Sequence, residues 1–134
     1  MIGRETARVV LPALAVLGAA FKPDSDDIRD SPALNVAAQL QLQGAVVRVT
    51  DPAAVSHARR AHPELGYASS AIEAVADAEV TLLLTEWQEF RELDPVSFGR
   101  IVRQKRVLDG RNALDRDRWE AAGWTYRALG RRVG

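Results

Sequence analysis

Residues 13–50 read ALAVLGAAFKPDSDDIRDSPALNVAAQLQLQGAVVRVT, and this stretch decides the fold. It opens with a short apolar run, residues 13–17, which has the length of a buried strand. After a polar loop, Ser31 and Pro32 are typical of the N-cap and the first position of a helix, and apolar residues then recur at helical spacing. A second apolar run, residues 46–50, completes a strand–helix–strand unit.

The rest of the chain continues the same alternation of strand and helix. The run from Val80 to Thr85 is typical of a strand buried on both faces of a parallel sheet. Further strands are expected at residues 106–108 and 124–129, and helices at residues 53–61, 71–76, 87–93, 95–104 and 115–122. We therefore expect a single α/β domain over residues 13–134, with a Rossmann-like, doubly wound parallel sheet in a three-layer arrangement. Residues 1–12 are expected to lead into this domain or to be the remnant of a linker.

The composition is that of an ordinary globular domain. The 134 residues are 47% hydrophobic and 27% charged, and eighteen basic side chains balance eighteen acidic ones. Proteins that coat nucleic acid need a cationic surplus, so no nucleic acid partner is expected. The longest apolar run, Val9 to Ala20, is shorter than the roughly 20 residues that cross a bilayer, so no membrane partner is expected either. We expect a soluble, cytoplasmic protein.

Polar and charged residues gather after the predicted strands, at the edge where open α/β sheets bind ligands. They stand in four segments, residues 18–29, 51–52, 85–87 and 109–112. Loops at the opposite edge have no such character. This asymmetry predicts a bound ligand, most simply a phosphorylated nucleotide. The first loop lacks the G-x-G-x-x-G spacing of a dinucleotide site, so the likeness to nicotinamide-binding folds is one of architecture.

Three cations in these segments are candidates for contact with a phosphate. Lys22 is one of only two lysines in the chain, which hints that a compact ammonium is needed there; the alternative is a solvated loop lysine. Arg29 stands just before a helix N-terminus, where anions bind, but an ion pair with Asp26 or Asp27 is an equal alternative. Arg111 has a planar fork that suits a bidentate phosphate contact; its alternative is a turn arginine that ties down the loop.

Other residues with reactive side chains fit structural roles better. The aspartates of the first loop are more typical of turns and helix caps than of a metal site, so no metal is predicted. His57 and His62 lack zinc spacing and are expected at the surface. The three tryptophans are expected to pack in the core. Since the chain has no cysteine, it has no thiol nucleophile, and no residue is predicted to be catalytic.

The segment at residues 17–32, LGAAFKPDSDDIRDSP, resembles a signature of the UDP-glucose dehydrogenase family, within the carboxy-terminal, UDP-binding domain. Asp-Pro at 51–52, Thr-Glu-Trp at 85–87 and Asp-Gly-Arg-Asn at 109–112 recur in the same order. The resemblance covers nearly the whole chain from Ala13 onward. The Thr-Glu-Trp element favours the UDP-glucose branch over the GDP-mannose and UDP-N-acetylhexosamine relatives.

The resemblance implies an NAD-dependent oxidation of UDP-glucose to UDP-glucuronate, in which an active-site cysteine traps the intermediate aldehyde. In such enzymes an amino-terminal Rossmann domain binds NAD, and a central helical region carries the cysteine and supports dimerisation. Carried over position by position, Phe21, Lys22 and Arg111 would contact the substrate. Arg29 would reach the NAD phosphates across the cleft between domains.

The chain also departs from that family. It has no cysteine, and it contains neither the amino-terminal dinucleotide domain nor the central helical region. We therefore expect part of a longer oxidoreductase that is inactive by itself, with those two domains as partners and homo-oligomer formation left open. The alternative is a non-catalytic Rossmann-like module for regulation or assembly, which would give no calorimetric response to UDP.

Overall fold

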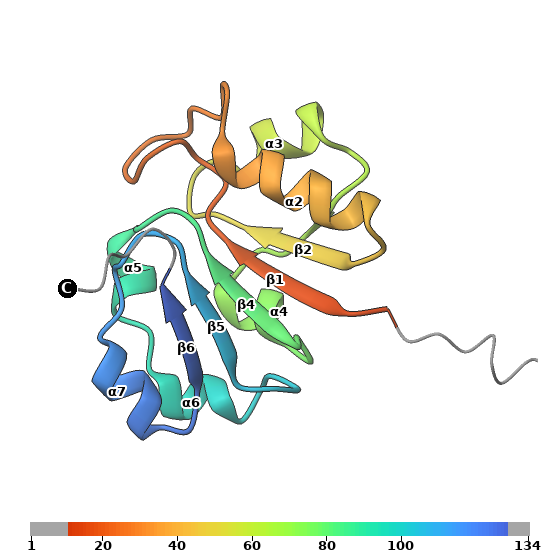
Figure 1. The fold of residues 1–134 in the computed structure, drawn as a ribbon. Coiled ribbons are helices and arrows are strands. Elements are labelled where there is room, and N and C mark those ends of the chain that lie inside the picture. Colours follow the sequence, from red (N-terminus) through yellow and green to blue (C-terminus); the bar gives the residue numbers. More distant parts are fainter. Residues whose placement is uncertain (1–10, 129–134) are drawn as a thin grey trace, which may run out of the picture.

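The computed structural model describes residues 11–128 as one six-stranded sheet with helices on its faces (Figure 1). The strands are β1 (Ala13–Leu17), β2 (Val46–Thr50), β3 (Gly66–Tyr67), β4 (Val80–Leu83), β5 (Arg106–Asp109) and β6 (Thr125–Ala128). The helices are α2 (Pro32–Leu42), α3 (Val55–Ala61), α4 (Ala71–Val75), α5 (Gln88–Arg91), α6 (Pro95–Gly99) and α7 (Arg116–Ala121). None of these helices is long and apolar enough to cross a membrane. Most of the predicted lead-in segment 1–12 lies outside the described residues, as do residues 129–134.

Every strand pairing in the described sheet is parallel, in the order β3-β2-β1-β4-β5-β6. Strand β1 lies in the middle of the sheet. From β1 the chain runs outward through β2 to the edge strand β3, crosses back to β4 beside β1, and then continues through β5 to the other edge, β6. This order confirms the predicted Rossmann-like, doubly wound α/β fold. The winding direction reverses between β1 and β4, where Leu17 pairs with Leu83.

Strand β3 has no counterpart among the predicted strands. It is only two residues long and pairs with β2, so it is too short to give an alternating pattern in the sequence. Its Tyr67 hydroxyl donates hydrogen bonds to the carbonyl oxygens of Ala58, at 2.9 Å, and His62, at 2.8 Å. These contacts hold the edge strand against α3 and its C-cap residue.

Several helices are shorter than predicted because nearby groups bind the backbone at their ends. The first two residues of the predicted helix 53–61 give their amides to the Asp51 carboxylate, at 2.8 and 2.9 Å, so α3 begins two residues later. The predicted helix 95–104 ends at Gly99, and the Arg103 amide turns to the Ala78 carbonyl oxygen at 2.8 Å. Helix α2 begins as predicted, with the Ser31 side chain accepting a hydrogen bond from the Leu34 amide.

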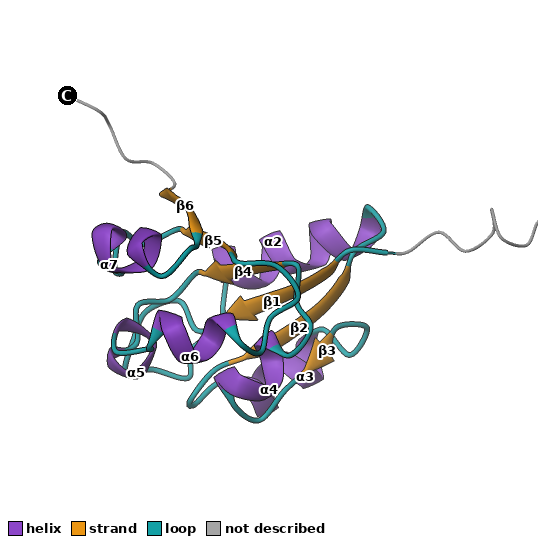
Figure 2. Ribbon diagram, turned by 90° about the horizontal axis from the view of Figure 1, so that it is seen from below, coloured by secondary structure: helices purple, strands orange, loops and turns teal. Residues whose placement is uncertain are grey.

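The sheet separates two apolar cores, because side chains alternate between its faces. Val16 faces the core beneath α2 and α3, whereas Leu17 faces the core beneath α4, α5, α6 and α7. Figure 2 shows the sheet between α2 on one side and α4, α5 and α6 on the other. On the α2 face, none of the described helices lies in front of β5 and β6 (Figure 1). A hollow of about 300 Å³ there is lined by Val80, Arg106, Val107, Leu108, Thr125 and Arg127.

Candidate functional site

Four loops meet at the carboxyl edge of the sheet, as predicted. The Thr85 hydroxyl, after β4, donates to the Ala20 carbonyl oxygen, after β1, at 2.8 Å. The Trp87 indole N–H donates to Asp51, after β2, at 3.1 Å. The loop after β5 joins this group because Arg111 pairs with Glu86, next to Thr85. Segments far apart in the sequence thus form one continuous rim.

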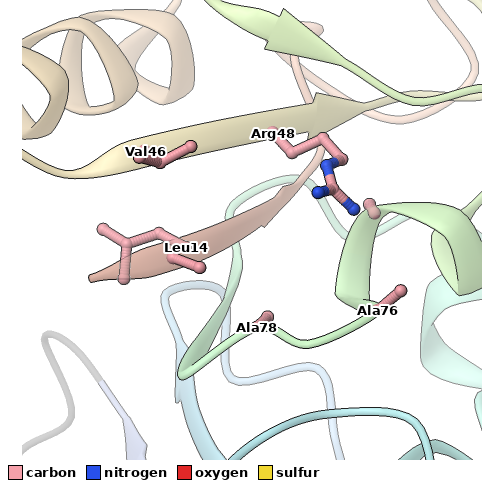
Figure 3. A pocket seen from close by; sticks show the side chains of 7 residues that line it. Leu14, Val46, Arg48, Ala76 and Ala78 are labelled. Carbon is pink, nitrogen blue, oxygen red and sulfur yellow. The ribbon is translucent and has the colours of Figure 1, made fainter. Parts of the chain in front are cut away.

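A small cavity lies at the opposite, amino edge of the sheet, between β1, β2 and the end of α4 (Figure 3). Its volume is about 20 Å³, enough for a single water, whereas ligand pockets typically measure roughly 300–1,000 Å³. Leu14, Val46 and Ala78 line it, and Arg48 donates to the Glu73 carbonyl oxygen at 2.7 Å beside it. This cavity is therefore too small to hold a nucleotide.

The loop after β1 carries two of the predicted substrate contacts at its exposed tip. It starts at Gly18, whose φ is +115° and where an added Cβ would lie 2.5 Å from the Thr85 side chain, so only glycine fits. The Phe21 amide donates to the Asp27 carbonyl oxygen at 2.8 Å and closes the loop. Phe21 is 51% exposed, and Lys22 is exposed beside it. Both side chains are free to meet a ligand.

Two buried aspartates, Asp51 and Asp109, hold the loops of the rim by accepting hydrogen bonds from their backbone amides. Asp51 accepts hydrogen bonds from the amides of Ala19, Ala20, Ala53 and Ala54 and from the Trp87 indole. Asp109 accepts hydrogen bonds from the amides of Arg111, Ala113 and Leu114 and from the Tyr126 hydroxyl. The predicted segments 51–52 and 109–112 therefore supply fixed turns, and the second turn carries the exposed side chains of Arg111 and Asn112.

Arg29 forms a two-point ion pair with Asp27. The guanidinium Nε and Nη2 atoms lie 3.0 and 2.9 Å from the two carboxylate oxygens. The hydrogen bonds from the Arg29 side chain and backbone amide lower the pKa of Asp27 to about 2. The Arg29 side chain is 87% exposed, and it lines a hollow of about 310 Å³ with Phe21, Asp27 and Asp30. Arg29 thus forms the ion pair with Asp27 that is the alternative to a phosphate contact, and its guanidinium remains exposed to solvent.

Arg111 forms a second two-point ion pair, with Glu86. Its Nε lies 2.9 Å and its Nη2 lies 3.3 Å from the two carboxylate oxygens, and both side chains are partly buried. Arg111 also lines a hollow of about 160 Å³ beside the start of α2, together with Pro32, Ala33, Val36, Leu84 and Gly110. The next residue, Asn112, has a φ of +55°, a conformation that bends the loop sharply.

The structure therefore groups the predicted site residues unevenly. Phe21 and Arg29 share one hollow, and Arg111 lines another on the same rim. The pair of Glu86 and Arg111 is not predicted from the sequence, although both residues stand in segments that are predicted at the same edge of the sheet. Within residues 11–128, no group of three or more His, Asp or Glu side chains is arranged to hold a metal ion.

The family model for the UDP binding domain of the UDP-glucose/GDP-mannose dehydrogenase family matches residues 15–116. This chain belongs to that family. As a UDP binding domain, it is 43% identical over 103 residues to the UDP-glucose 6-dehydrogenase AglM of Haloferax volcanii, a match that covers 77% of this chain and 24% of that enzyme. It is 39% identical over 118 residues to the UDP-glucose 6-dehydrogenase of Rhizobium meliloti, covering 88% of this chain and 27% of that enzyme.

Solved structures show the same domain inside larger enzymes. A UDP-glucose dehydrogenase from Pyrobaculum islandicum aligns with a TM-score of 0.72 at 30% identity, over 92% of this chain and 26% of that one. An NDP-N-acetyl-D-galactosaminuronic acid dehydrogenase from Methanosarcina mazei aligns with a TM-score of 0.80 at 27% identity, over 91% of this chain and 25% of that one. The UDP binding domain described here thus spans about a quarter of the length of its relatives.

Proposed function

We propose that this domain binds the UDP group of UDP-glucose within an NAD-dependent UDP-glucose 6-dehydrogenase, which oxidises UDP-glucose to UDP-glucuronate. The observation that carries the proposal is the continuous rim at the carboxyl edge of a UDP binding domain. Phe21, Lys22, Arg29 and Arg111 all lie on loops of that rim. The names of the curated relatives support UDP-glucose as the substrate.

The cations of the rim suit a diphosphate in different ways. Arg111 uses Nε and Nη2 to bind Glu86, which leaves Nη1 to donate to a phosphate oxygen. Lys22 supplies a compact, mobile positive charge from the tip of the β1 loop. The exposed Phe21 ring supplies an apolar surface for the sugar or the base. In this proposal Phe21, Lys22 and Arg111 contact the substrate.

The described residues do not form a complete site for NAD. The amides of Ala19 and Ala20, which a dinucleotide fold would direct at a pyrophosphate, are bound to Asp51. Arg29 is the one predicted cofactor contact, and its guanidinium is exposed. We propose that NAD is bound mainly by another domain of the enzyme and that Arg29 contributes a single contact to its phosphates.

The remaining chemistry belongs to other parts of the enzyme in this proposal. The chain has no cysteine and so does not supply the thiol that would trap an aldehyde. Its role is to bind and orient the nucleotide sugar against an NAD-binding domain and a central domain. Residues 1–12 would connect it to the preceding domain. The purified 134-residue chain should therefore produce no NADH from UDP-glucose and NAD.

Calorimetric titration of the purified chain with UDP tests the proposal. We expect binding in the micromolar to millimolar range, weakened by Lys22→Ala and by Arg111→Ala. Arg103→Ala is the matched control, because Arg103 is exposed on the loop before β5, at the amino edge of the sheet. If millimolar UDP gives neither heat nor a shift in melting temperature, the alternative of a non-catalytic module is favoured.

A second candidate substrate comes from the family itself. The Methanosarcina mazei structure is that of a dehydrogenase of an N-acetylated sugar nucleotide. Competition between UDP-glucose, UDP-N-acetylhexosamines and GDP-mannose for the UDP site decides between these branches. Stronger binding of GDP-mannose than of UDP-glucose would contradict the UDP-glucose assignment.

A further inference from the structure

Five N–H donors converge on the carboxylate of Asp51, which is 6% exposed. One oxygen, Oδ2, accepts from the Ala19 amide at 2.8 Å, the Ala20 amide at 3.0 Å and the Trp87 indole at 3.1 Å. The other oxygen, Oδ1, accepts from the amides of Ala53 and Ala54 at 2.8 and 2.9 Å. This carboxylate therefore ties together the loops after β1, β2 and β4.

The β1 loop is also fixed from its carbonyl side. The Ser31 hydroxyl donates to the Ala19 carbonyl oxygen at 2.7 Å, and the Thr85 hydroxyl donates to the Ala20 carbonyl oxygen at 2.8 Å. The peptide groups at these two positions are thus held in one orientation, with their N–H groups directed at Asp51. Because neighbouring residues bind both the donors and the acceptors, the loop cannot turn these amides toward another anion without breaking buried hydrogen bonds.

Successive backbone amides after the first strand of an open α/β sheet are a common cradle for a phosphate group. In this chain the cradle already contains a negatively charged group with two oxygens. A phosphate at the same place would have to displace the carboxylate and would meet its charge at short range. In a dinucleotide-binding loop such amides are free to bind a phosphate, whereas in this chain Asp51 already binds them.

We propose that Asp51 is an internal anion that occupies the phosphate cradle of the β1 loop, and that it thereby excludes dinucleotide and nucleotide phosphates from the inner part of the sheet edge. Asp51 is in this sense a specificity-determining residue. Ligand phosphates are left to the exposed side chains of the rim. The proposal does not depend on the identity of the nucleotide that the rim binds.

The variant Asp51→Ser tests the proposal by opening the cradle while keeping the local turn. A serine at this position still caps the amides of Ala53 and Ala54, as serine does at helix N-termini, but it does not reach Ala19 and Ala20. We expect inorganic phosphate to raise the melting temperature of the variant, with an apparent Kd in the millimolar range. Sodium chloride at equal ionic strength corrects for screening. The unmodified chain should show a smaller rise, because phosphate can then reach only the exposed cations of the rim.

Asp115→Ser is the matched control, since Asp115 caps α7 by accepting a hydrogen bond from the Arg118 amide and, within residues 11–128, binds no amide of a second loop. It should gain no response to phosphate. A folded Asp51→Ser variant that responds to phosphate no more than this control would overturn the proposal.

A second measurement uses the unmodified chain, so that it stands even if Asp51→Ser does not fold. NMR couplings across the hydrogen bonds from the Ala19 and Ala20 amides to the Asp51 carboxylate should persist at saturating pyrophosphate and at millimolar NAD. Their loss on addition of either compound would contradict an occupied cradle. Because neither experiment uses UDP, a failure of UDP binding and a failure of this inference are told apart.

Discussion

The Arg111 guanidinium and the Glu86 carboxylate face each other across the ends of β5 and β4, joined by contacts of 2.9 and 3.3 Å. Two contacts between planar groups fix the rotation of the arginine fork, which a single contact would not. The backbone of the same arginine is fixed as well, because its amide donates to the buried Asp109 at 3.1 Å. Arg111 is therefore held in place before any ligand arrives.

This arrangement predicts that Arg111→Lys is not a conservative substitution. Lysine keeps the charge but cannot bind Glu86 and a phosphate with one planar group. We expect UDP affinity to fall about tenfold, or about 1.4 kcal/mol, while the free energy of unfolding changes by less than about 1 kcal/mol. Calorimetry with UDP and a urea melt measure the two quantities. Equal UDP affinity in Arg111→Lys and the unmodified chain would show that the fork is not used.

The pair between Asp27 and Arg29 predicts a carboxyl group that titrates at unusually low pH. Its pKa of about 2 lies below the usual 3.8, because the Arg29 hydrogen bonds favour the charged form. A depressed folded-state pKa stabilises the fold above the unfolded pKa, and this contribution is lost as the pH falls from about 4 through about 2. Carbon-13 NMR of the side-chain carboxyl should place the midpoint near 2. In Arg29→Gln the midpoint should return toward the usual value, and an unchanged midpoint would rule out the pair in solution.

Two buried threonines, Thr81 near the start of β4 and Thr85 just after its end, predict opposite effects of the same substitution. Among the described residues, the Thr81 hydroxyl has no hydrogen-bond partner, whereas the Thr85 hydroxyl donates to Ala20. Thr81→Val removes an unsatisfied buried group and should stabilise the fold by about 1 kcal/mol, whereas Thr85→Val should destabilise it by about 1–3 kcal/mol. Thermal melts of both variants give the sign directly. Destabilisation by both substitutions would show that Thr81 has a partner in solution.

Alanine substitutions at two glycines with positive φ measure backbone strain with and without steric overlap. Gly18 has a φ of +115°, and a Cβ added there would lie 2.5 Å from the Thr85 side chain. Gly44 has a φ of +106°, and a Cβ added there would have no neighbour within 4 Å. We expect Gly44→Ala to cost about 1–2 kcal/mol and Gly18→Ala more than about 3 kcal/mol. Chemical denaturation measures both. Similar losses in the two variants would mean that the β1 loop yields to accept the methyl group.

The sequence predicts the architecture well because the main strands are continuous apolar runs separated by helices with clear start residues. Ser31 with Pro32, for example, places the start of α2 correctly. The two-residue strand β3 escapes prediction because it depends on hydrogen bonds from Tyr67 to Ala58 of α3 and to His62 just after α3, and not on its own pattern. The early end of α6 depends in the same way on a bond from Arg103 to Ala78, far away in the sequence.

The location of the candidate site is predictable from the sequence, but the roles of its side chains are not. The rule that ligands bind beyond the carboxyl ends of strands places the four segments on one rim. The same rule does not distinguish side chains that face a ligand from those that build the rim. Asp51 and Asp109 stand in the predicted ligand segments, and only the hydrogen bonds that their buried carboxylates accept from backbone amides identify them as internal supports.

The all-parallel sheet has a consequence for synthesis of the chain. The central pair joins Leu14 of β1 to Val80 of β4, so β1 emerges from the ribosome long before its second neighbour. No hairpin can form early, because parallel strands need a crossover between them. Until β4 is made, one side of β1 offers unpaired backbone groups to any other extended chain, and this half-built sheet is the stage of biogenesis most exposed to aggregation.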